Sequence, residues 1–451
     1  MPLERSISLP QAILYGVGVI IGAGIYSLVG VAAGITGNLL WLSFVIAGLI
    51  AALTAYSYSR LIRMFPKVAA ESVYVLKAFD SRKLAFFVGI LSLLTGLFSV
   101  ATVSWGFATY FKLFFVIDPL VIAVLIILFL SIVNFLGIQE SVMLNNVTTF
   151  FTIFGMGLII IFGLRFVGNV DLFLGPDGTN FIQNPFHLLP GIFSAATLMF
   201  FAYLGFEQIA NVSEEVINAR RNAPKAVIIA LIVTTLIYIL ISIVAVSVAS
   251  PSELSLAADP NIPLTQGPLA LVAEIAVAPG FGFILSLVAL CAISGTIIVL
   301  LNVCSRIVYG LSNEGLLPKI FSKTSRRKTP HLSIILVLVV ALLLTFVGDI
   351  ELLGKITTTG TFLLFFMVNT SFVRIKLKHR NYFIKKPDYS IILPILGAVF
   401  CISMFLTQYW APVNIFGLNI PLIFLSTIMF IIAFLPYYFF NKQNKQNHFE
   451  D

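Results

Sequence analysis

The stretch GVGVIIGAGIY, residues Gly16–Tyr26, opens the first long apolar segment of the chain and carries Gly16, Gly18, Gly22 and Gly24. Glycine costs about 1 kcal/mol relative to alanine at an interior helix position. A segment that should form a rigid helix therefore carries four residues that weaken helices. Three interpretations compete: a dinucleotide-binding loop, a face for close helix packing, or a helix that breaks.

The composition predicts a membrane protein. Of the 451 residues, 59% are hydrophobic and 10% are charged, whereas soluble proteins carry about 25% charged residues. The three cysteines lie in apolar stretches and the four histidines are scattered. These positions match neither a disulfide framework nor a metal-ligand spacing.

The apolar stretches predict an all-α integral membrane protein. About twelve of them reach the roughly 20 residues that a helix needs to cross a bilayer. They lie near 12–34, 39–63, 84–113, 118–137, 145–167, 188–212, 225–249, 280–311, 331–347, 355–375, 389–408 and 419–440. No literal sequence repeat is evident.

The distribution of Lys and Arg predicts the orientation. With the N-terminus inside, nearly all of these residues fall in inner segments, and the outer loops hold Lys112, Arg165 and Lys355. This bias places both termini in the cytoplasm and the chain in the cell membrane. It also accounts for the net charge of +8, through contact with anionic lipid and without nucleic acid as a partner.

The chain reads as a single membrane transport domain, 1–451. We expect two five-helix halves, two appended helices and a cytoplasmic tail, over 1–167, 188–377, 389–440 and 441–451. The polar loops are too short for a separate catalytic domain. The sequence pattern shows no paired carboxylates, no His cluster and no nucleophile–base pair. We therefore expect that the protein is not an enzyme. Interrupted spans in corresponding places of two halves indicate a transporter binding site.

The three interpretations of the glycines differ in what they require. A dinucleotide fingerprint needs a preceding strand and a βαβ unit, and the residues before Gly16 are too few. Gly18-x-x-x-Gly22 also fits a small-residue helix contact. A break at Gly22-Ala23-Gly24 would open backbone N–H donors at a half-helix N-terminus, where a carboxylate binds well. The helix-packing contact and the helix break do not exclude each other.

The sixth span, MFFAYLGFEQIANVSEEVINARRNAPKAV at Met199–Val227, holds Glu207 inside an apolar run. An ionisable residue there is costly in lipid and indicates function. The alternative is a hydrogen-bonded residue that only tethers helices. Gly205, close by, again permits a break.

Four stretches, in order along the chain, resemble signatures of the amino acid–polyamine–organocation permeases. They are GVIIGAGIYSLVG in the first span, FPKVAAESVYVLKAF after the second, FFAYLGFEQIANVSEEVINARRNAP in the sixth, and SRIVYGLSNEGLLPKIF at the end of the eighth. The second departs from the usual glycine pair around Val68 and Ala69. The resemblance is specific for the family and says little about the substrate.

The resemblance implies the leucine-transporter fold, an inverted repeat of five plus five helices with broken helices 1 and 6, followed by two further helices. It implies amino acid transport by alternating access. Backbone N–H groups of the first break would bind the carboxylate, and carbonyls of the sixth span would bind the amino group under a gating Phe201. The implied substrate-binding residues are Gly22, Ala23, Gly24, Ile25, Phe201, Ala202, Tyr203 and Gly205. Plain apolar packing is the alternative for Phe201, and Glu207 matches a glutamate that links the unwound region to neighbouring helices.

The expected pocket favours a neutral amino acid. Ile25, Phe201, Ala202 and Tyr203 are mainly apolar, and no acidic side chain besides Glu207 is placed to hold a cationic side chain. This counts against arginine, lysine and polyamines as substrates.

The coupling mechanism stays open. Many relatives carry a lysine in the fifth span, and here that position falls on Thr152. The vacated site suits Na⁺, with Gly18, Ile21, Ser294 and Thr296 as further ligands implied by the fold. The alternatives are H⁺ coupling through Glu207 or another carboxylate, or an exchanger or facilitator without ion coupling. A transporter of a related amine, a channel and a non-transporting receptor are further rivals, and no cofactor is expected.

Overall fold

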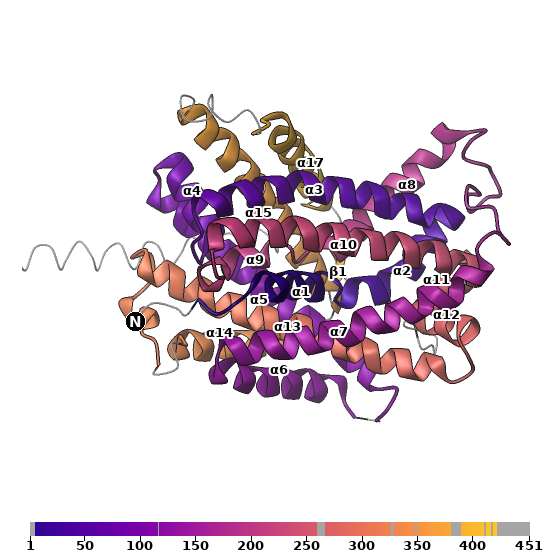
Figure 1. The fold of residues 1–451 in the computed structure, drawn as a ribbon, viewed down its shortest axis with the longest axis horizontal. Helices are drawn as coiled ribbons and strands as arrows, with labels where there is room; N and C mark the ends of the chain where they lie inside the picture. Colours follow the sequence, from indigo (N-terminus) through magenta and orange to yellow (C-terminus); the bar gives the residue numbers. More distant parts are fainter. Residues whose placement is uncertain are drawn as a thin grey trace, which may run out of the picture.

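A computed structural model of the protein describes residues 5–115, 117–258, 267–325, 329–347, 350–379, 389–409, 412–415 and 418–421. Within this part of the chain, nine helical segments are long and apolar enough to cross a membrane. Most of the long helices run side by side along one direction of the molecule (Figure 1).

The helices of the spans have the following bounds: α1 (Leu9–Ile20), α2 (Ala23–Thr36), α3 (Leu40–Met64), α5 (Arg82–Phe111), α6 (Pro119–Leu136), α7 (Ile138–Gly163), α8 (Pro185–Phe200), α9 (Gln208–Asn211), α10 (Ala219–Val248), α13 (Phe281–Asn313), α14 (His331–Thr345), α15 (Ile350–Lys378) and α17 (Ile392–Tyr409). Each of the first eleven predicted spans corresponds to one of these helices or to a broken pair. The all-α fold class and the breaks in the first and sixth spans are therefore confirmed. The two inverted halves stay a prediction.

Short elements in the connections complete the described fold. They are α4 (Ala70–Phe79), α11 (Pro251–Ala257), α12 (Pro268–Ala276), η1 (Gly37–Leu39), η2 (Leu164–Phe166), η3 (Phe201–Tyr203), η4 (Ser213–Glu215), η5 (Lys319–Ser322), β1 (Pro412–Ile415) and β2 (Leu418–Pro421). The two strands pair antiparallel. Strand β2 occupies the start of the predicted twelfth span, and residues 422–440 of that span lie outside the described residues.

Local sequence fixes where several helices begin. The Ser81 hydroxyl accepts from the Leu84 amide at 3.3 Å, and the Asp118 carboxylate accepts from the Leu120 amide at 2.8 Å. Such N-cap side chains satisfy amides that have no partner within the helix. Helix α4 begins differently, after Ala69 in a left-handed conformation with φ +51°. Glycine adopts this conformation most readily, so the departure from the usual glycine pair has a cost in backbone energy.

Packing divides the helices into an interior and a lipid-facing surface. Helices α5 and α13 lie mainly inside the molecule, whereas α6 and α7 expose large apolar side chains. Phe129, Phe150 and Ile161 are exposed by 60%, 63% and 66% respectively. A contiguous apolar surface of this kind is suited to lipid rather than to water. This surface and the span lengths identify a multi-pass membrane protein.

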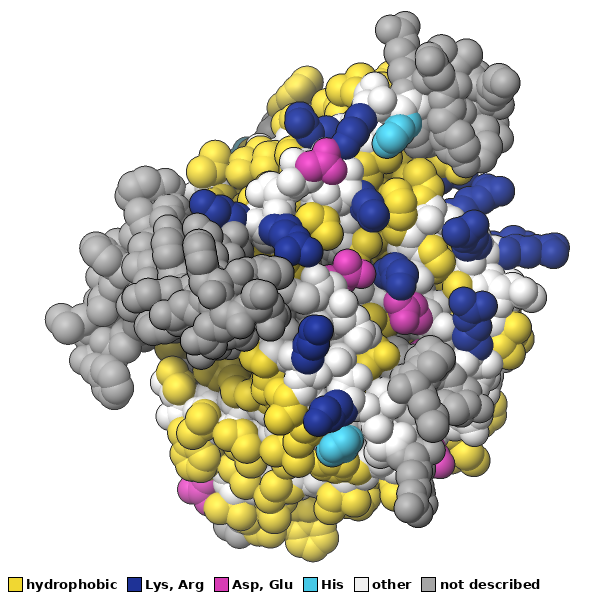
Figure 2. Space-filling model, turned by 90° about the vertical axis from the view of Figure 1, so that its left-hand side faces the viewer, with side chains coloured by type: hydrophobic (Ala, Val, Ile, Leu, Met, Phe, Trp, Pro, Cys, Tyr) yellow, Lys and Arg dark blue, Asp and Glu magenta, His cyan; other side chains and the backbone are white. Residues whose placement is uncertain are grey.

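Basic side chains gather at one end of the bundle, which we call the basic face. Figure 2 shows Lys and Arg spread over this end, above a surface that is mostly hydrophobic. Cavities there are lined by Arg5, Arg60, Arg63, Lys67, Lys77, Arg220, Arg221 and Lys225. The same residues carry much of the inner charge bias in the sequence, so the structure brings the expected cytoplasmic side together on one face.

Candidate functional site

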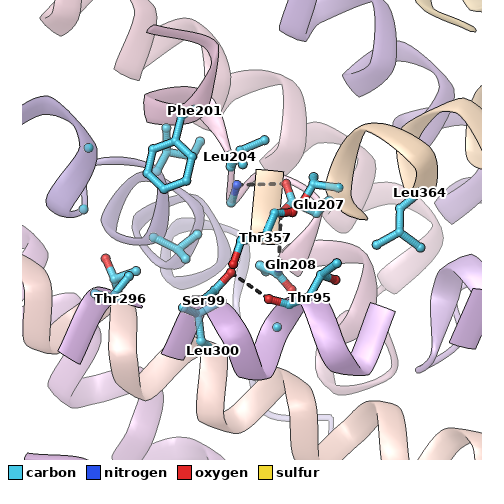
Figure 3. A pocket seen from close by; sticks show the side chains of 18 of the residues that line it. Thr95, Ser99, Phe201, Leu204, Glu207, Gln208, Thr296, Leu300, Thr357 and Leu364 are labelled. Carbon is cyan, nitrogen blue, oxygen red and sulfur yellow. Dashed lines mark hydrogen bonds between the residues drawn. The ribbon is translucent and has the colours of Figure 1, made fainter. Parts of the chain in front are cut away.

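A cavity lies between the two broken helices and is closed on its other sides by α3, α4, α5, α13 and α15. The cavity has a volume of about 80 Å³, which is above the roughly 10–15 Å³ needed to admit a single water molecule. Figure 3 shows Phe201, Ser99, Thr357 and Gln208 converging on this space from different elements.

The first break lies at Ile21 and Gly22. The helical conformation ends at Ile21, and Gly22 is extended, with φ −97° and ψ −150°. Helix α2 begins directly afterwards with no side-chain cap at its N-terminus. The first amides of a helix have no partner within it and carry partial positive charge. Because Gly22 and Gly24 line the cavity, these donors lie beside it.

The second break spans Leu204 to Glu207. After η3 the chain becomes extended at Leu204, and Gly205 takes φ +128°, a conformation that favours glycine. The Gly205 amide donates to Glu207 Oε2 at 2.8 Å, and Gln208 Nε2 donates to Glu207 Oε1 at 2.9 Å. The carboxylate therefore satisfies donors of the broken segment itself.

Small residues let the two breaks approach each other. A Cβ atom added to Gly24 would lie 2.9 Å from Ala202 Cα, and one added to Gly22 would lie 2.5 Å from Thr296 Oγ1. The backbone of α2 thus passes directly against η3, which only a glycine at position 24 allows. Gly16 packs in the same way, with its added Cβ 2.5 Å from Ile209 Cδ1 on α9.

Tyr238 on α10 bridges both breaks. Its hydroxyl lies 2.8 Å from the Ile20 carbonyl oxygen and 3.0 Å from the Ala202 carbonyl oxygen. The side chain is fully buried. The single hydroxyl proton is thus shared between one carbonyl oxygen at each break. Sequence reasoning missed this residue, because a tyrosine in an apolar span has no distinguishing pattern.

The predicted substrate-binding residues separate into two groups. Gly22, Gly24, Phe201, Ala202 and Gly205 line the cavity, as does Glu207. Ile25 and Tyr203 are fully buried and are not among the lining residues. The Tyr203 hydroxyl instead donates to the Phe44 carbonyl on α3 at 2.9 Å. Ala23 is the first residue of α2 and is likewise not among the lining residues.

Much of the lining comes from helices that the sequence interpretation did not include. Both hydroxyl and apolar side chains from α5 and α15 line the cavity. The hydroxyl side chains are those of Ser92, Thr95, Ser99, Thr102, Thr357 and Thr361. Serine and threonine are too common in membrane helices for sequence alone to identify these as lining residues. The pocket is more polar than the expected apolar one.

Glu71 is a second carboxylate at the cavity, so the expectation that Glu207 stands there alone is wrong. It belongs to α4, is 2% exposed, and lines the same space. The motif FPKVAAESVYVLKAF had singled out this segment only for its missing glycines. The useful signal was an acidic residue one position after the apolar pair Ala69-Ala70 in a connection between two spans.

The residues proposed for ion coupling are partly brought together. Thr296 Oγ1 lies 3.5 Å from the Gly18 carbonyl oxygen, and an added Cβ on Gly18 would meet Thr149 and Asn145 of α7. The Asn145 side chain is fully buried, and both its amide atoms lack a partner among the described residues. Oxygens of this kind fit Na⁺. Sequence reasoning missed Asn145 as a group at this site.

The remaining ion-site predictions have less support in the geometry. Thr152 and Ser294 donate back to carbonyls of their own helices, those of Thr148 and Leu290, each at 2.8 Å. Ile21 directly follows the last residue of α1, and it is fully buried. Of the five predicted residues, Gly18 and Thr296 are the two that the structure joins directly.

A buried ion pair lies between the cavity and the basic face. Arg306 Nε on α13 donates to Glu215 Oε1 at 2.9 Å, and their side chains are 0% and 1% exposed. Arg306 Nη1 also donates to Asn134 Oδ1 on α6 at 3.3 Å. The Glu215 carbonyl accepts from the amides of Ser6 and Ile7, each at 3.0 Å. The N-terminal segment, η4, α6 and α13 are thereby joined near the N-terminal end of α1.

Comparison with known proteins agrees with this architecture. The family model described as amino acid permease matches residues 7–435. The chain is 30% identical to the methylthioribose transporter of Bacillus subtilis over 427 residues, which cover 89% of this chain and 87% of that protein. It is 26% identical to the branched-chain amino acid permease BcaP of the same organism, over 91% of this chain and 90% of that protein. It is 28% identical to a mitochondrial cationic amino acid transporter of Arabidopsis thaliana, over 83% of this chain and 63% of that protein.

Proposed function

Because the chain belongs to the amino acid permease family, and is thus a membrane transporter rather than an enzyme, we propose that it carries small neutral amino acids by alternating access. The observation that carries the proposal is the meeting of two broken helices at one cavity. Gly24 of α2 and Ala202 of η3 approach so closely that no side chain fits between them. Opposed half-helix ends of this kind suit a zwitterion, which presents one anion and one cation.

The carboxylate of the substrate binds at the start of α2. The uncapped amides at the start of α2, including that of Gly24, lie beside the cavity at the positive end of that helix. No Lys, Arg or His is among the residues that line the described cavity. The anion is therefore held by backbone donors, without a buried formal positive charge.

The amino group binds on the opposite side, at the carbonyls of Phe201 and Ala202 and near the Glu207 carboxylate. A carbonyl oxygen has two lone pairs, so the Ala202 oxygen can accept from an ammonium while Tyr238 occupies its other position. The cavity volume and its mixture of hydroxyl and apolar groups favour a small, uncharged side chain. A related amine remains the second candidate for substrate.

Transport follows from exposing this cavity to each side in turn. Phe201 is half-buried at the cavity and closes over bound substrate. The Arg306–Glu215 pair and the docked N-terminal segment close the path to the basic face, which we place in the cytoplasm with both termini, at the plasma membrane. Substrate shifts the balance between the two states only by binding them unequally. Where Na⁺ is the coupling ion, Gly18, Asn145 and Thr296 would hold it and add its binding energy to that of the substrate.

The proposal is tested by counterflow. Purified protein is reconstituted in liposomes, and each labelled compound is tested against a lumen loaded with the same unlabelled compound. The compounds are alanine, serine, leucine, phenylalanine, lysine and putrescine, with methylthioribose as a further arm. We expect the small neutral amino acids to exchange fastest. Exchange of methylthioribose, lysine or putrescine with no exchange of neutral amino acids would overturn the assignment, and ion fluxes that far exceed transporter turnover would indicate a channel.

A further inference from the structure

The cavity holds a polar cluster that substrate binding does not use. Glu71 accepts hydrogen bonds from the Tyr58 hydroxyl at 3.0 Å and from the Ser92 hydroxyl at 3.4 Å. Asn211 Nδ2 lies 3.1 Å from each of its carboxylate oxygens. The donors come from α3, α5 and α9, and the carboxylate from α4. One buried carboxyl group therefore joins four separate elements.

The charges around this cluster are unbalanced. Glu71 and Glu207 line one cavity, and no Lys, Arg or His is found among its described lining residues. The titratable groups that face Glu71 are Tyr58 of α3, Tyr74 of α4 itself and Glu207 of the second break. Helices α5 and α15, which pack against α4, contribute only neutral residues to the cavity lining. Two carboxylates in such an interior are not both ionised without a cation, so one of them holds a proton.

The partners of the two carboxylates decide which one can gain and lose that proton. Glu207 accepts from the backbone amide of Gly205, and an amide cannot reverse its role. Glu71 faces two hydroxyls, those of Tyr58 and Ser92, which can donate or accept by rotating. A proton on Glu71 Oε2 can therefore point to the Ser92 oxygen, while Tyr58 and Asn211 still donate to Oε1. Burial also raises the pKa of Glu71 above its usual range.

Helix α4, which carries Glu71, borders two cavities. Helix α4 carries Glu71 toward the central cavity, while Val73, Leu76 and Lys77 of the same helix line a cavity on the basic face. The short helix is thus a partition between the substrate site and the inner solution. Asn211 ties this partition to α9, since its Oδ1 also accepts from the Ala70 amide at 2.9 Å.

We propose that Glu71 is the proton-carrying group of the transporter, binding H⁺ from the central cavity with the substrate and releasing it toward the basic face when α4 and α9 separate. This inference rests on the proposed function. Protonation removes the charge that holds Asn211, so loading the proton loosens the contact between α4 and α9. Proton and substrate movement are coupled through that contact.

The test follows both solutes in the same liposomes. Wild-type protein is reconstituted around a pH-sensitive dye, and lumenal acidification is recorded together with uptake of a labelled neutral amino acid, with Na⁺ absent and then present. We expect one proton signal that scales with uptake. In Glu71→Gln, which keeps an acceptor oxygen for Asn211, we expect the proton signal per substrate to fall at least tenfold and counterflow to become flat with pH. Glu314→Gln, at a carboxylate lining the basic-face cavity, is the matched control and should match wild type.

A second variant keeps the test decisive if Glu71→Gln fails to fold. Tyr58→Phe removes one donor to the carboxylate, which raises the pKa of Glu71. The midpoint of the pH dependence should therefore move to higher pH. Three results would each overturn the proposal. They are wild-type proton coupling in Glu71→Gln, an unmoved midpoint in Tyr58→Phe, and substrate uptake by wild type without any proton signal. Absent counterflow of any amino acid in wild type would instead overturn the proposed function itself.

Discussion

Gly24 has the most demanding position in the cavity. It lines the space where the carboxylate is placed, and its Cα faces the backbone of Ala202. A side chain there meets main-chain atoms of η3, which cannot rotate away as a flexible side chain could. Gly24 thus has a backbone amide without a partner in its helix, and its contact with Ala202 leaves no room for a side chain.

We predict that Gly24→Ala lowers amino acid affinity at least tenfold, about 1.4 kcal/mol or more. The added methyl group would lie 2.9 Å from Ala202 Cα and would push the two breaks apart. Affinity is measured by scintillation proximity with the best labelled substrate. Gly157→Ala on α7 is the matched control, because its added Cβ meets nothing within 4 Å. Unchanged affinity in Gly24→Ala would show that Gly24 does not contribute to substrate binding.

Tyr238 gives a second prediction at this scale. Tyr238→Phe removes the hydroxyl that lies within 3.0 Å of both the Ile20 and the Ala202 carbonyl oxygens. A buried acceptor without its donor costs about 1–3 kcal/mol, and an entering water or ammonium can recover part of it. We expect weaker substrate binding, with a smaller fall in thermal stability. Wild-type affinity in Tyr238→Phe would show that the bridge does not shape the site.

At the residue scale, the sequence showed the backbone part of the site and missed most of the side-chain part. Glycines in a membrane span conflict with helix propensity, so Gly22, Gly24 and Gly205 were visible as exceptions. Tyr238 and Asn145 obey every local rule for a membrane helix. Their importance depends on which helices cross, and that information is absent from one sequence.

In the proposed function, the elements around Arg306 close the path from the cavity to the basic face. The guanidinium on α13 meets Glu215 of η4 and Asn134 of α6, while the backbone of Glu215 holds the N-terminal segment. Moving any of these elements toward an inward-open state must hydrate or separate a fully buried ion pair. Such pairs contribute little net stability but penalise the loss of one partner.

We predict that Arg306→Met alone lowers the free energy of unfolding by about 3–5 kcal/mol, because it leaves Glu215 charged and unpaired. Thermal unfolding of detergent-purified protein measures the effect. The double variant Arg306→Met with Glu215→Met should recover most of the loss, since no buried charge remains. Equal destabilisation in the single and double variants would mean that packing, rather than charge pairing, holds this region.

Element boundaries were predictable where apolarity alone decides them and unpredictable elsewhere. Span lengths located α3, α5 and α13 closely. Helix α7 begins at Ile138, seven positions before the predicted span, because Gln139 and Glu140 are polar yet helical. Helices α4, α11 and α12 escaped prediction because they lie in connections, and α4 nevertheless contributes Glu71 to the cavity.

Over the whole molecule, the cavity depends on two segments about 180 residues apart, near Gly22 and Gly205. Neither break alone makes a site for a zwitterion, because each offers one kind of partner, amides or carbonyls. The family membership and the basic face were both readable from the sequence, since motif order and charge bias extend along the full chain. The position of Glu71 at the cavity could not be read from the sequence, because Glu71 lies in a connection between two spans.

The central claim is that the site recognises both ends of an amino acid. The most direct test is competition for the best labelled substrate by three compounds that share its side chain: the amino acid, the amine that lacks the carboxylate, and the acid that lacks the amino group. We predict that the amino acid competes and that each analogue is weaker by at least a hundredfold, about 2.7 kcal/mol. Competition by the amine or the acid as strong as that of the amino acid would contradict the account.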